Sequence, residues 1–236
     1  MSGYYVALGD SMSIDDYAGG PGRGAASLLF RNRDTDFPGW QGRDLAGIGF
    51  EARLLARDGA TTIDVLDRQL PAVDRPPTLV TISMGGNDLL AAYGDTDAAR
   101  AAVARVGAQG EGVLTRLRAA AGGNCRIVLS TVYDPSDGTG VVPGSGLPPW
   151  PDGPAMLHLL NTTLAGLAER HGAALADVHD RFLGHGVTVG DPSRSDPRPS
   201  ERELWYCGTV EPNAWGASGI REAWWRALAD LPDLPR

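Results

Sequence analysis

Five short segments along the chain are near-continuously apolar, and each ends in a polar or Gly-containing turn. They show little alternation between apolar and polar positions, which is typical of strands buried on both faces of a parallel sheet. The segments are YYVAL (4–8), FEARLLA (50–56), TLVTISM (78–84), RIVLSTVY (126–133) and AALADV (173–178). The pattern therefore predicts a five-stranded parallel sheet.

Helical periodicity separates the predicted strands. Alternation of strands and helices gives an α/β sandwich with right-handed crossovers. Helices are expected at 61–70, at 95–123, at 154–172, and in a last segment whose apolar stripe contains Ile220, Trp224 and Leu228. The second of these contains Gly107, Gly110 and Gly112, and we expect them to break it in two, because each Gly costs ~1 kcal/mol in a helix interior.

The length of 236 residues fits a single domain spanning 1–236. Three loops are longer than a scaffold of this kind needs, at 12–49, 134–153 and 184–211. Ligands bind beyond the carboxyl ends of the strands in open α/β folds. We therefore expect these loops to form the walls or lids of a cleft.

Charge and composition exclude several classes of partner. The net charge of −8 argues against nucleic acid, which requires basic surface, and against docking on an anionic membrane. No apolar run approaches the ~20 residues of a membrane span, and MSGYYVALGD lacks the features of a signal peptide. We expect a cytoplasmic protein in which Cys125 and Cys207 are free thiols.

Three residues with complementary chemistry directly follow predicted strands. Ser11, Gly59 and Asn87 each lie in the turn after one strand, and such turns open on the same edge of a parallel sheet. Together they would bring a hydroxyl, a backbone amide and a carboxamide to one crevice. These groups suit acyl transfer, which uses a nucleophile and hydrogen-bond donors that stabilise an oxyanion.

The turns GDSM (9–12), DGATT (58–62) and GGND (85–88) resemble the first three sequence blocks of the SGNH/GDSL hydrolases, an esterase superfamily. The resemblance implies a flavodoxin-like three-layer sandwich with helices on both faces of the sheet. It also implies hydrolysis of a small-molecule carboxylic ester, of acyl or O-acetyl type, without a cofactor. Ser11 would attack the carbonyl, while the Ser11 amide, the Gly59 amide and the Asn87 side chain would hold the oxyanion.

The last block of that superfamily, Asp-x-x-His before Pro-Asn, is matched only in part by GTVEPNAWGASGI (208–220). Gly208 stands at the Asp position and Glu211 at the His position. A Ser hydroxyl is a poor nucleophile without an adjacent base, so three alternatives follow. Glu211 is itself the base, after burial raises its pKa; or His185 is the base and Glu211 orients it; or the Ser11 pocket binds a ligand without turnover.

Aromatic residues in the long loops indicate what the cleft could accept. Trp40, Trp150 and Trp205 could line an apolar acyl pocket or stack against a sugar ring.

Overall fold

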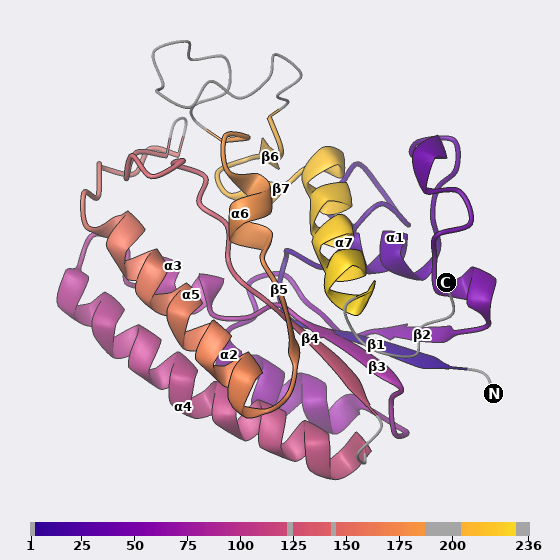
Figure 1. The fold of residues 1–236 in the computed structure, drawn as a ribbon. Coiled ribbons are helices and arrows are strands. Elements are labelled where there is room, and N and C mark those ends of the chain that lie inside the picture. The colour runs from indigo at the N-terminus through magenta and orange to yellow at the C-terminus, as the bar shows by residue number, and fades with distance from the viewer. Residues whose placement is uncertain (1–2, 122–124, 143–144, 187–203, 230–236) are drawn as a thin grey trace.

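A five-stranded parallel sheet forms the centre of the computed structural model, which describes residues 3–121, 125–142, 145–186 and 204–229 (Figure 1). The strand order is β2-β1-β3-β4-β5, and β1 pairs with both β2 and β3. This confirms the predicted sheet. The strands are β1 (Tyr4–Leu8), β2 (Glu51–Leu54), β3 (Leu79–Ile82), β4 (Arg126–Ser130) and β5 (Ala174–Ala176).

Helices cover both faces of the sheet, so the three-layer arrangement is confirmed (Figure 1). Side chains alternate along β1: Val6 and Leu8 pack toward one helical layer, whereas Tyr5 and Ala7 pack toward the other. The first layer contains α2 (Thr62–Asp64), α3 (Gly86–Leu90), α4 (Thr96–Ala121) and α5 (Gly153–Arg170). The second contains α1 (Ala25–Phe30), α6 (Val178–Phe182) and α7 (Ala214–Ala229).

Helix α4 is a single helix of 26 residues, so the expected break at its glycines was wrong. The reason is its packing against α5 and against Met84, which lies just beyond β3. A Cβ added at Gly110 would lie 2.7 Å from Leu167 Cδ1 and 3.0 Å from Met84 Cε, and one at Gly107 would lie 3.2 Å from Thr163. Glycine thus allows close approach of the neighbouring side chains, and this tertiary packing outweighs the low helix propensity of Gly.

Short elements complete the fold. The helix expected at 61–70 begins as α2, continues as a π-helical turn η3 (Val65–Gln69) and ends with the 3₁₀ turn η4 (Leu70–Ala72). The segment 12–49, expected as a loop, contains α1 and the 3₁₀ helices η1 (Pro38–Trp40) and η2 (Ala46–Ile48). Of the third expected loop, 187–203 lie outside the described residues, and the remainder contributes an antiparallel pair, β6 (Tyr206–Cys207) and β7 (Glu211–Pro212).

The turn after β1 is fixed by buried polar side chains from neighbouring segments. The Gly9 amide donates to Gln69 Oε1 at 2.7 Å, and Gln69 Nε2 donates back to the Gly9 carbonyl at 2.8 Å. Ser83 Oγ, just beyond β3, accepts from the Asp10 amide at 3.2 Å and donates to Asp10 Oδ1 at 2.7 Å. Only glycine fits at position 9, since φ is +129° and a Cβ would lie 2.2 Å from the Ser83 carbonyl oxygen. The position of Ser11 follows from these bonds.

Two further expectations concern the cysteines and the membrane. Cys125 and Cys207 are both free thiols, as predicted. Within the described residues, none of the helices combines the length and the apolar character needed to cross a bilayer.

Replacing Gln69 with Leu is expected to lower the free energy of unfolding by about 1–3 kcal/mol, because it leaves the buried Gly9 amide and carbonyl without partners. Denaturant unfolding monitored by tryptophan fluorescence measures the change. Gln41→Leu, at an exposed position, is the matched control and should change stability little. Equal stability of the two variants would contradict this role of Gln69.

Candidate active site

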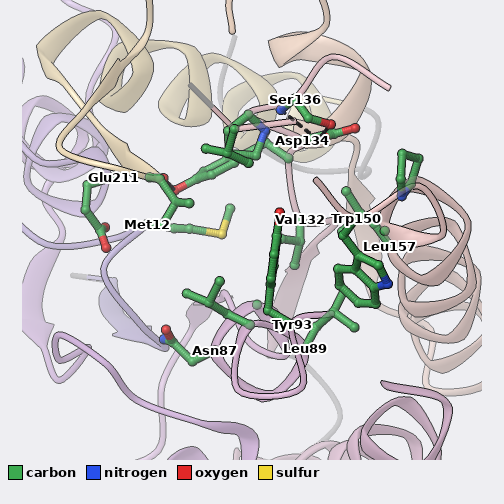
Figure 2. Close-up of a pocket in the computed structure, with 18 of the residues that line it drawn as sticks. Met12, Asn87, Leu89, Tyr93, Val132, Asp134, Ser136, Trp150, Leu157 and Glu211 are labelled. Atoms are coloured by element: carbon green, nitrogen blue, oxygen red, sulfur yellow. Dashed lines mark hydrogen bonds between the residues drawn. The ribbon is translucent and has the colours of Figure 1, made fainter. Parts of the chain in front are cut away.

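Ser11 opens onto a cavity at the carboxyl edge of the sheet. The residue follows the fixed Gly9–Asp10 turn, and only 7% of its surface is exposed. The cavity has a volume of about 130 Å³. Its lining includes Met12, Asn87, Leu89, Tyr93, Val132, Trp150, Leu157 and Glu211 (Figure 2). The structure thus brings Ser11, Asn87 and Glu211 to one cavity.

Asn87 is held in the first turn of α3, directly after β3. Its Nδ2 donates to the Ala60 carbonyl at 3.0 Å. A carboxamide carries two N–H donors, so one remains for a ligand. The same bond ties Asn87 to the turn that contains Gly59.

Gly59 is exposed and is not among the residues that line the cavity. Its φ of +67° favours glycine in this turn. Within the described ranges, neither the Ser11 amide nor the Gly59 amide donates a hydrogen bond to the protein. Both N–H groups therefore remain available to a ligand.

Glu211 is placed by the β6–β7 hairpin, where it pairs with Cys207. The hydroxyl of Tyr133 donates to the Val210 carbonyl at 2.7 Å and anchors the hairpin. Asn213 Oδ1 accepts from the amides of residues 215 and 216, at 3.0 Å each, and so caps α7. Gly208 lies in the hairpin turn with a φ of +55°. The Pro-Asn pair of the last block thus fixes the start of α7 and, with it, the position of Glu211.

The environment of Glu211 raises the pKa of its carboxyl group. Burial is the largest cause; the Ser11 hydroxyl opposes the rise, and the charges of Asp58 and Asp10 add to it. Glu211 Oε2 is buried and has no hydrogen-bond partner in the part of the chain that the structure describes. A carboxylate of this kind, beside a hydroxyl, is suited to accept a proton.

Asp10 is a second buried carboxyl group beside Ser11, and the sequence pattern predicted no role for it. Burial raises its pKa to about 6, against the hydrogen bonds from Ser83 and the Met12 amide. The one sequence feature that could have indicated a role is the position of Asp10 between Gly9 and Ser11 in GDSM. Asp10 holds the turn, and its charge acts on Glu211.

His185 lies elsewhere. It lines a different cavity, together with Trp40 and Trp205, and its ring stacks on Trp205 with centroids 3.6 Å apart. It is not among the residues that line the Ser11 cavity. Of the three tryptophans considered from the sequence, only Trp150 borders Ser11's cavity.

The groups around Ser11 offer a hydroxyl, a nearby carboxylate and uncommitted N–H donors. Among the described residues, His, Cys, Asp and Glu side chains form no group of three or more that could hold a metal ion. The residues at hand are thus equipped for nucleophilic attack on a carbonyl and stabilisation of the resulting oxyanion.

Comparison with known proteins agrees with this chemistry. Residues 7–217 match the model of the GDSL-like lipase/acylhydrolase family. The chain is similar to a lipase from Streptomyces rimosus, with 28% identity over 214 residues, which cover 80% of this chain and 74% of that protein.

Solved structures show the same architecture. The extracellular lipase from Streptomyces rimosus aligns with a TM-score of 0.64 and 25% identity, over 96% of this chain and 100% of that chain. An acetylxylan esterase from Geobacillus stearothermophilus aligns with a TM-score of 0.64 over 99% of this chain and 97% of that chain; at 16% identity it shows the fold alone. On the match over residues 7–217, the chain belongs to the GDSL-like lipase/acylhydrolase family, and this membership supports ester hydrolysis as its activity.

Proposed function

We propose that the protein hydrolyses a carboxylic ester through a covalent acyl intermediate on Ser11, with Glu211 as the general base. One observation carries the proposal: Ser11 and the half-buried Glu211 line the same cavity, and burial raises the pKa of the Glu211 carboxyl group. Asn87 lines the same cavity and has one uncommitted N–H.

The first half of the reaction forms the acyl-enzyme. Ser11 Oγ attacks the ester carbonyl carbon while Glu211 takes the hydroxyl proton. The negative charge that develops on the carbonyl oxygen is stabilised by the Ser11 amide and Asn87 Nδ2, whose residues line the cavity. Protonated Glu211 then gives its proton to the departing alcohol oxygen as the C–O bond breaks.

The second half releases the acid. Water attacks the acyl carbon, and Glu211 accepts a proton from that water. The bond to Ser11 Oγ breaks, the proton returns to Ser11, and the carboxylic acid leaves. No cofactor takes part in this sequence of steps.

A glutamate can replace the more usual histidine base only if its pKa is raised. At its ordinary value of ~4.3 a carboxylate is a weak base toward a serine hydroxyl. Burial and the neighbouring Asp58 and Asp10 carboxylates shift the pKa of Glu211 upward, toward the range in which base catalysis is efficient at neutral pH. Membership of a hydrolase family favours turnover over the alternative of binding alone.

Ser11→Ala is expected to lower kcat/KM for p-nitrophenyl esters by at least about 10³-fold, because the attacking atom is lost. Initial rates of p-nitrophenolate release measure this. Ser27→Ala, a buried serine on α1, is the control and should retain activity. A Ser11→Ala variant as active as the control would refute the proposed nucleophile.

Glu211→Gln is expected to lower kcat by about 10²–10⁴-fold, the usual contribution of a general base. In the wild type, kcat/KM should fall as the pH drops through the raised pKa of Glu211, since only the carboxylate accepts the Ser11 proton. The pH–rate profile of Glu211→Gln should lack this limb. Glu169→Gln, at an exposed position of α5, should keep both rate and profile.

Full activity of Glu211→Gln, with an unchanged acidic limb, would assign the base to another group.

A further inference from the structure

The Ser11 cavity has two chemically different ends. Figure 2 shows Glu211 and Asn87 on one side and Trp150 and Leu157 on the opposite side, with Met12 and Val132 between them. The first side carries the polar groups proposed for catalysis. The second is lined mainly by aliphatic and aromatic side chains.

The position of Glu211 indicates which half of an ester occupies which end. In the proposed mechanism protonated Glu211 must reach the departing alcohol oxygen, so the alcohol lies on the Glu211 side. Polar groups also lie near Glu211, beyond the residues that line the cavity: the Tyr17 hydroxyl donates to the exposed Asp58 carboxylate at 3.0 Å. The pKa of Tyr17 is raised mainly by this hydrogen bond and further by the charge of Glu211; the pKa of Glu211 is raised mainly by burial and further by the charge of Asp58. The acyl group therefore extends the other way, past Met12 and Val132 toward Trp150.

The far wall is built as a fixed surface. Only 7% of Trp150 is exposed, its amide donates to the Gly140 carbonyl at 2.8 Å, and its ring meets Tyr93 edge-on with centroids 5.1 Å apart. The Tyr93 hydroxyl donates to the Pro148 carbonyl at 2.8 Å. Because these contacts hold Trp150 in place, its ring limits how far a bound acyl chain can extend.

The Asp134 and Ser136 side chains at this end are paired with each other, whereas the buried Trp150 Nε1 has no partner among the described residues. Ser136 Oγ donates to Asp134 Oδ1 at 2.6 Å, and the amides of residues 136 and 138 also donate to Asp134. Asp134 is therefore engaged with its own loop. The surface that remains for a ligand is the one formed by Leu89, Val132, Trp150 and Leu157.

We propose that Trp150 determines acyl-chain specificity, and that the substrates are esters of unbranched apolar acyl groups longer than acetyl. This inference rests on the proposed function. An acetyl group would leave the Trp150 end unfilled, whereas each further buried methylene raises kcat/KM by up to about fourfold. Acyl chains too long to fit between Ser11 and Trp150 are excluded, because the Trp150 ring blocks them.

The test compares kcat/KM for p-nitrophenyl acetate, butyrate, hexanoate, octanoate and laurate. The wild type should rise from acetate to an intermediate optimum and then fall. Trp150→Ala should move the optimum to a longer chain, and Leu157→Phe, which adds volume to the same wall, should move it to a shorter one. Trp215→Ala, a 49% exposed tryptophan on α7 that borders the other cavity, should leave the profile unchanged.

Thermal unfolding and labelling of Ser11 by a fluorophosphonate, measured on each variant, separate the causes of failure. Two outcomes would overturn the role of Trp150 while leaving the proposed function intact. One is a wild type that prefers acetate; the other is a Trp150→Ala variant in which kcat/KM changes by the same factor for all esters while Ser11 is still labelled. Absence of both hydrolysis and labelling in the wild type would overturn the proposed function, and the inference with it.

Discussion

The candidate active site depends on how the end of β1 satisfies its buried backbone groups. The chain turns sharply after Leu8, and the Gly9 amide and carbonyl are removed from water at that point. Gln69 bonds to both groups, and Ser83 bonds to the amide and carboxylate of Asp10. Unpaired buried groups would each cost roughly 1–3 kcal/mol, so the turn has one favourable conformation. That conformation determines the position of Ser11.

A second constraint is electrostatic. Asp10 and Glu211 are carboxyl groups close to Ser11, and each has a raised pKa. Burial makes ionisation costly for both, and the charge on one disfavours the charge on the other. The Ser11 hydroxyl partly opposes this rise in the pKa of Glu211. A glutamate in this environment is thus a stronger base than an exposed glutamate.

Much of this could be predicted from the sequence, because some signals are local. Near-continuous apolar segments identify the strands. Parallel strands then bring the turns at Ser11 and Asn87 to one edge of the sheet, independently of the conformation of the long loops. Other features depend on distant contacts. Gly110 lies in an unbroken helix only because Leu167 and Met84 pack against it. The raised pKa of Glu211 depends on burial, which the sequence pattern around it does not encode.

His185 illustrates the same limit. It follows the fifth strand, so its loop was expected near the cleft. Its ring instead stacks on Trp205, a residue 20 positions further along the chain, and lines another cavity.

The most direct test of the Ser11–Glu211 pair is intact-mass analysis after brief exposure to a fluorophosphonate. The proposed mechanism predicts one adduct on the wild type, none on Ser11→Ala, and markedly slower labelling of Glu211→Gln. An unlabelled wild type at neutral and alkaline pH, or labelling of Glu211→Gln at the wild-type rate, would contradict it.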